Sequence, residues 1–167
     1  MRRSIVALSL AAFAAAVAPA VSSAQTRITT QRIGDLEYYS GTIDGRRVSG
    51  TTQHLGDFSY TTVRIGGDSY RATTQRIGSF DYTQWNNGLR STRQNVGDFS
   101  YTRTSTGSRY TTQHLGDFSY TTGSDGFRAR TYRLGDYSYT TAGTRPYSWT
   151  AKPSSTYPYS YRPGRDW

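Results

Sequence analysis

The sequence predicts an all-β protein: a repetitive antiparallel β-meander of about twelve short strands, in a single twisted sheet that curls towards closure. Three observations lead to this prediction: a motif that recurs six times, glycines in turn positions within and between the copies, and an alternation of side chains with a period of two. The twelve residues TTQHLGDFSYTT occur twice without change, at 51–62 and 111–122. Such repetition makes a repeat architecture the first one to consider.

The first 24 residues have the layout of a secretory signal peptide. Two arginines precede an apolar run, and the small residues Ser22 and Ala24 stand ahead of Gln25. The apolar run is short and Pro19 follows it, so we expect cleavage after Ala24 and no transmembrane helix in the mature chain. We therefore expect an exported protein, periplasmic, extracellular or on the cell surface.

The composition of the mature chain points to a thin core and to anionic partners. Cysteine is absent, and 15 tyrosines, 5 of the 6 phenylalanines of the sequence and 3 tryptophans supply most of the bulk. Without Arg2 and Arg3 the chain has 18 basic and 11 acidic residues, a net charge of +7. That excess favours polyanions, although arginines on solvated strand faces also keep a sheet soluble. Export makes nucleic acid an unlikely partner.

Each repeat copy contains one glycine in the same position, followed by Asp or, once, by Ser79. The turn glycines are Gly34, Gly56, Gly78, Gly97, Gly116 and Gly135, spaced by 22, 22, 19, 19 and 19 residues. A two-residue loop that begins with glycine is typical of a type II′ hairpin turn, because glycine takes the positive φ of its first position. Period-2 alternation then puts Gln53, Leu55, Phe58 and Tyr60 on one side of the hairpin.

The change of period from 22 to 19 tests the meander. In the 22-residue copies, a two-residue return loop such as Asp44-Gly45 joins strands of eight and ten residues. In the 19-residue copies, a three-residue loop that ends in glycine joins strands of six and eight, so every side chain keeps its face. Trp85 is then opposite Leu89, and Gly123 is opposite Phe127. The last copy, TYRLGDYSY from Thr131, reads as one residue shorter.

The alternative fold is a β-solenoid, in which each copy forms one coil and the coils stack in parallel. In its repeat length and in the Gln and Gly inside each repeat, the chain resembles curli-type fibre subunits, which favours this alternative. The second Gln of a curlin repeat is missing here. The IGD hairpin repeats ahead of FxY, over roughly residues 29–141, are similar to uncharacterised short bacterial secreted proteins with IGD or IGN repeats. That resemblance implies no activity.

Three parts follow from these patterns: a signal peptide at 1–24, a β-hairpin repeat domain at 25–141 and a tail at 142–167. In the tail four prolines alternate with Tyr and Ser. We expect this Pro/Tyr-rich segment to be extended and disordered, with polyproline II character.

No residue is predicted to be catalytic, to bind a cofactor or to hold a metal. His54 and His114 have no recurring partner ligands, so we interpret them as ordinary solvated strand residues. The recurring Asp35, Asp57, Asp98, Asp117 and Asp136 occupy the second position of a hairpin loop, where turn chemistry favours Asp. We therefore expect no enzyme.

A row of tyrosines is the candidate binding face. It comprises Tyr38, Tyr60, Tyr82, Tyr101, Tyr120 and Tyr139. The structural interpretation, which we favour, is that these rings form the core. The functional interpretation is an aromatic platform with amides and arginines nearby, suited to sugar rings or to another copy of the chain.

Three functions fit these observations. The first is an exported non-enzymatic protein with a structural or adhesive role at the cell envelope or in the extracellular matrix, since an open sheet has edges that favour self-association. The second is a binding module for acidic polysaccharide or envelope polymer that uses a Tyr/Arg face. The third is an outer-membrane β-barrel.

Overall fold

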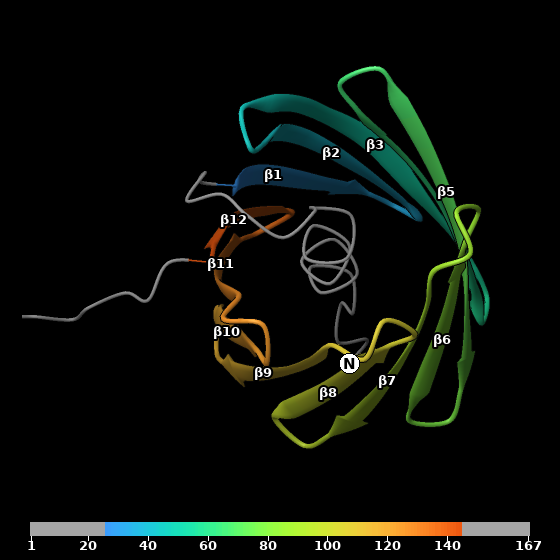
Figure 1. Ribbon diagram of the computed structural model, residues 1–167, viewed down its shortest axis with the longest axis vertical. Helices are drawn as coiled ribbons and strands as arrows, with labels where there is room; N and C mark the ends of the chain where they lie inside the picture. The colour runs from blue at the N-terminus through green and yellow to red at the C-terminus, as the bar shows by residue number, and fades with distance from the viewer. Residues whose placement is uncertain (1–25, 145–167) are drawn as a thin grey trace, which may run out of the picture.

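The computed structural model describes residues 26–144, which form twelve strands in a closed barrel (Figure 1). The strands are β1 (Thr26–Ile33), β2 (Leu36–Ile43), β3 (Arg46–Leu55), β4 (Phe58–Ile65), β5 (Asp68–Ile77), β6 (Phe80–Trp85), β7 (Arg90–Val96), β8 (Phe99–Thr104), β9 (Arg109–Leu115), β10 (Phe118–Gly123), β11 (Arg128–Leu134) and β12 (Tyr137–Gly143). The predicted antiparallel meander is confirmed. The solenoid alternative is wrong, because every neighbouring pair of strands is antiparallel.

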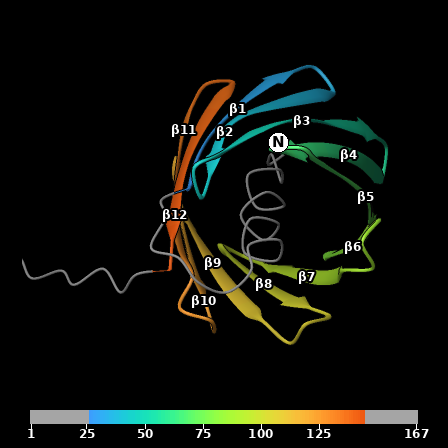
Figure 2. The ribbon, with the colours of Figure 1, turned by 45° about the horizontal axis from the view of Figure 1, so that its top comes forward.

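Closure joins the first strand to the last. β1 pairs with β12 from Thr26↔Ala142 to Gln31↔Tyr137, so the two edges of the meander pair with each other (Figure 2). The argument that open edges drive self-association therefore does not hold. β12 runs to Gly143, two residues into the segment assigned to the tail. Residues 1–25, which include the predicted signal peptide, and residues 145–167 lie outside the described part.

The turns have the geometry that the glycines predict. The six turn glycines have φ between 57° and 61°, and the residues that follow them are not in the positive-φ region, as a type II′ turn requires. The three-residue return loops end in glycines with φ of 82° to 92°. Trp85 N–H donates to Leu89 C=O and Gly123 N–H to Phe127 C=O, at 2.8 and 2.7 Å. The compensation that keeps each side chain on its face is confirmed, although β7, β9 and β11 have seven residues rather than the predicted eight.

Backbone hydrogen bonds connect the Gly-Asp turns into one rim, which we call the turn rim. The carbonyl of each turn's second residue accepts from the hairpin beyond: His54 N–H donates to Asp35 C=O, and the ring closes where Arg32 N–H donates to Asp136 C=O, both at 2.9 Å. The opposite rim carries the return loops. Both ends of the described chain, Thr26 and Thr144, lie at this return rim because β1 and β12 pair there.

The strands are tilted, which brings equivalent residues of the six hairpins to one height. Within a hairpin, Leu55 is opposite Phe58, but across to the next hairpin Phe58 is opposite Gln75, two residues short of the turn residue Ile77. The same stagger occurs at all six junctions between hairpins, a total of twelve residues for twelve strands. A total stagger equal to the number of strands corresponds to strands tilted by about 36° from the barrel axis.

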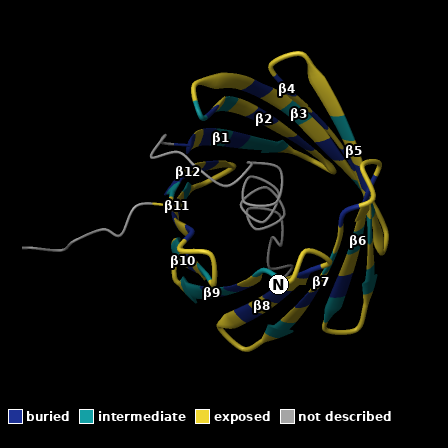
Figure 3. Ribbon diagram, viewed as in Figure 1, coloured by how far each residue is buried: buried dark blue, intermediate teal, exposed yellow. Residues whose placement is uncertain are grey.

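Small and β-branched residues make up much of the inner face of the barrel, and a smaller number of large side chains lie among them. Most inner positions alternate with exposed outer ones along each strand (Figure 3). Near the return rim the inner face is apolar, with a cluster of Ile28, Tyr39, Ile43, Val48, Val63, Ile65, Ala72, Trp85 and Leu89. The middle is lined by threonines, and cross-strand hydroxyl pairs such as Thr52–Thr61 and Thr112–Thr121 lie 2.7 and 2.8 Å apart. Most of the aromatic side chains expected in the core lie instead on the outer face of the barrel.

Candidate functional site

The outer surface next to the turn rim is apolar on all twelve strands. On each strand the outward residue adjacent to the turn is aliphatic or aromatic. We call this set the apolar row: Ile33, Leu36, Leu55, Phe58, Ile77, Phe80, Val96, Phe99, Leu115, Phe118, Leu134 and Tyr137. Ten of these side chains are large hydrophobics with 36% to 59% exposure, and the other two, Phe80 and Phe118, are half-buried.

A second row lies one outward position further from the turns. We call it the Tyr/Gln row: Gln31, Tyr38, Gln53, Tyr60, Gln75, Tyr82, Gln94, Tyr101, Gln113, Tyr120, Tyr132 and Tyr139. In five hairpins a tyrosine is directly opposite a glutamine, as in Tyr60↔Gln53. All six predicted binding-face tyrosines belong to this row and are 41% to 47% exposed. The structure therefore places them outside, and their interpretation as core is wrong.

The apolar row and the Tyr/Gln row together form what we call the outer belt. Successive outward residues are about 6.6 Å apart along a strand, which becomes about 5 Å along the barrel axis at the tilt given above. With the width of the side chains, the outer belt is about 10 Å high. Aromatic rings stack within it: Phe80 with Tyr82 at 6.2 Å and Phe99 with Tyr101 at 6.4 Å between centroids.

Charges flank the outer belt on both sides. The five turn aspartates are exposed at the turn rim, where each occupies the second turn position, and they form a rim rather than a pocket. On the other side, beyond a row made mostly of threonines, six exposed arginines form what we call the arginine row: Arg27, Arg64, Arg71, Arg90, Arg109 and Arg128. The arginine row lies six residues from the apolar row, or about 16 Å along the axis.

At two positions of the outer surface, the last repeat copy replaces a residue that the other five copies share. Tyr132 is directly opposite Tyr139 and takes the place of the glutamine, and Arg130 takes the place of the first threonine. This copy is therefore not shorter. Arg130 lies over the Phe118 ring, with Cζ 4.9 Å from the centroid, and 6.0 Å from the centroid of Tyr120.

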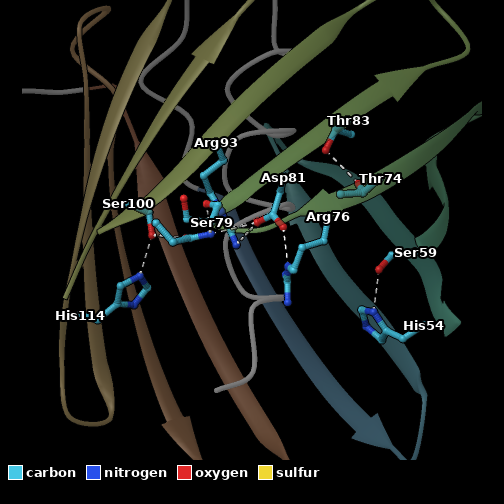
Figure 4. A network of polar contacts seen from close by, with 11 residues as sticks. His54, Ser59, Thr74, Arg76, Ser79, Asp81, Thr83, Arg93, Ser100 and His114 are labelled. Carbon is cyan, nitrogen blue, oxygen red and sulfur yellow. Dashed lines mark hydrogen bonds and ion pairs between the residues drawn. The ribbon is translucent and has the colours of Figure 1, made fainter. Parts of the chain in front are cut away.

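The inner face near the turn rim holds the charged groups that the barrel buries. Asp81 accepts from Arg76 Nε at 2.8 Å and pairs with Arg93 at 2.6 Å (Figure 4). Burial lowers the pKa of Arg93, and the Asp81 carboxylate counteracts this effect. Glu37 is also buried, and its Oε1 lies 3.5 Å from His54 Nε2. Sequence reasoning missed this network, because only closure shows that these positions face inwards.

The two histidines belong to the same inner region. His54 Nδ1 lies 2.8 Å from Ser59 Oγ (Figure 4). His114 Nδ1 lies 2.9 Å from Ser119 Oγ. Ser100 Oγ is 3.2 Å from His114 Nε2. Both histidines are half-buried inside the barrel, so the expectation that they are solvated strand residues is wrong. Burial also raises the pKa of Tyr39, whose hydroxyl lies 2.7 Å from Thr52 Oγ1.

Two further observations concern residues 26–144 alone. No three of their His, Asp and Glu side chains converge in a way that could hold a metal ion. This part of the chain also contains no helix of the length and apolar character needed to cross a membrane.

Comparison of the chain with protein-family models, with curated proteins and with solved structures finds no match.

Proposed function

We propose that the protein is an exported, non-enzymatic protein with a structural or adhesive role at the cell envelope or in the extracellular matrix, and that it attaches through the outer belt. One observation carries the proposal: most of the large apolar side chains of the outer belt are exposed on the outside of a closed barrel. Contiguous exposed apolar surface of this kind marks interaction sites in soluble proteins.

The closed barrel supports attachment through side chains rather than through strand edges. Every strand of the described chain is paired on both sides, so no strand edge is available for a partner strand. The outer belt therefore has to supply the contact. The six hairpins present nearly the same side chains to the outside, a form of repetition that suits attachment at several points.

The test is cell fractionation with matched variants. Phe58→Gln with Phe99→Gln removes two rings of the outer belt, and Arg64→Gln with Arg71→Gln changes two exposed arginines outside it. We expect the parent and the arginine variant in the envelope or matrix fraction, and the phenylalanine variant in the soluble fraction with unchanged circular dichroism. Recovery of the parent as a free soluble monomer would overturn the proposal.

A further inference from the structure

We infer that the outer belt binds an acidic polysaccharide. The principal binding subsite for this polymer is a sector on β10–β12 that consists of Phe118, Tyr120, Arg130, Tyr132 and Tyr139. The inference rests on the proposed function and names the partner of the same surface. Within residues 26–144 it is carried by Arg130, an exposed arginine of the adjoining row whose guanidinium lies against two rings of the outer belt.

The sector is a contiguous wall across three strands. Tyr120 is opposite Arg130, Phe118 is opposite Tyr132, and Tyr132 is opposite Tyr139. The rings of Phe118 and Tyr132 are 4.9 Å apart at an interplanar angle of 30°. Tyr120, Tyr132 and Tyr139 are 36% to 46% exposed, so their rings are open to a ligand.

Arg130 is held by rings rather than neutralised by an acid. Within residues 26–144 no carboxylate forms an ion pair with it, and its guanidinium lies over Phe118 and beside Tyr120. A guanidinium in this position keeps its donors for a carboxylate or sulfate, which it can bind in a bidentate manner. The surrounding tyrosines offer ring faces for the apolar faces of a sugar and hydroxyls for hydrogen bonds.

The other hairpins extend the site along a polymer. Five of them repeat a Tyr–Gln pair, which combines a ring face with an amide that donates and accepts. Equivalent residues of successive hairpins are two strands, or about 10 Å, apart around the barrel. A flexible polysaccharide that follows the outer belt therefore contacts several subsites at once, and these linked contacts raise the overall affinity.

Two other occupants suit the outer belt less well. A second barrel is also convex, so it would touch only a few of the twelve strands and leave most of the outer belt uncovered. A lipid bilayer would have to accommodate glutamines on five strands, and the outer belt is about 10 Å high whereas membrane barrels present an apolar band of about 25 Å. A wrapped polysaccharide meets neither difficulty.

The test is binding of the mature protein to polygalacturonate, with dextran as the neutral polymer and phosphatidylglycerol vesicles as the lipid. Arg130→Gln should weaken binding to polygalacturonate at least tenfold, as expected for the loss of a charge-assisted contact. The control Arg71→Gln, an exposed arginine outside the outer belt, should weaken it less than threefold. Tyr120→Ala with Tyr132→Ala should weaken it at about 0.5 M salt, where charge contributes little.

Five outcomes would overturn the inference. Equal loss in Arg130→Gln and Arg71→Gln would reduce the binding to general charge attraction, and equal binding to dextran would remove the acid preference. Binding to vesicles alone would assign the outer belt to lipid. Self-association that Tyr120→Ala abolishes, without polysaccharide binding, would assign it to a second copy. If the protein stays with the envelope through its phenylalanines but binds no polysaccharide, this inference fails and the proposed function stands.

Discussion

The Asp81–Arg93 pair inside the barrel gives the sharpest prediction about stability. Asp81 and Arg93 are buried, with side-chain exposures of 6% and 10%, and the contact is 2.6 Å long. Replacing Asp81 by Asn removes the charge and keeps the shape. Arg93 would then lose the Asp81 carboxylate while it stays in a buried environment, which already disfavours its charged form.

The expected cost is large. Breaking a buried ion pair by removing one partner costs about 3–5 kcal/mol. With a urea dependence of about 2 kcal/mol per molar, Asp81→Asn should lower the urea midpoint by about 2 M. Asp81→Asn with Arg93→Gln should recover part of this loss, because no unpaired charge is left at position 93. The measurement is equilibrium unfolding of the protein in urea, monitored by circular dichroism.

The matched control is a pair of the same length on the surface. Arg46 and Asp68 are also 2.6 Å apart, but their side chains are 49% and 57% exposed. Exposed pairs contribute about 0–1 kcal/mol, so Asp68→Asn should lower the midpoint by less than about 0.5 M. Equal shifts in the two variants would refute the argument that burial, and not contact distance, sets the cost.

Four further predictions concern the turns, the sheet, titration and the chain end. Gly56→Val should cost about 1–3 kcal/mol because φ is +61°, whereas Gly67→Val, at an open position without positive φ, should melt like the parent. Gly50→Ala should lower the melting temperature, because its Cβ would lie 2.4 Å from a backbone carbonyl oxygen of β4. Burial, and to a smaller extent a hydrogen bond to the Asp125 carboxylate, raises the pKa of Tyr110 to about 12. The free energy of unfolding should therefore fall between pH 10 and 12, and it should fall less in Tyr110→Phe. Removal of residues 145–167 should leave the β-type circular dichroism intact, since all twelve strands end by Gly143.

The sequence by itself determined the local structure of the repeat. Glycine at the first turn position allows the type II′ geometry, and the turn sets which residues are opposite each other, such as Leu55 and Phe58. Because side chains alternate with a period of two, every later residue of the strand then has a defined face. The exposed aromatic rings, the candidate binding tyrosines among them, were assigned to one face correctly on this basis.

Only the tertiary structure decided which face is inside. The face with Phe and Tyr is the more apolar, so the pattern favoured it as the core, yet closure places it outside. The concave side of a closed barrel has less room than the convex side, and it is lined largely by Thr, Ser, Ala and Gly. At Gly41 an added Cβ would collide with the backbone of β1, at 2.0 Å from the Arg27 carbonyl oxygen. Most of the large rings lie on the convex side, where neighbouring side chains diverge, while Tyr39, Trp85, Tyr110 and Phe127 are buried inside.

The candidate site depends on both levels. Sequence identified the six tyrosines, but it read the last repeat as one residue shorter and so missed that Arg130 and Tyr132 take the places of a threonine and a glutamine. The register of β10, β11 and β12 brings them beside Phe118 and Tyr120. Pairing between strands, which depends on backbone hydrogen bonds across the whole sheet, decides such neighbours, whereas a turn determines only the two strands that it joins.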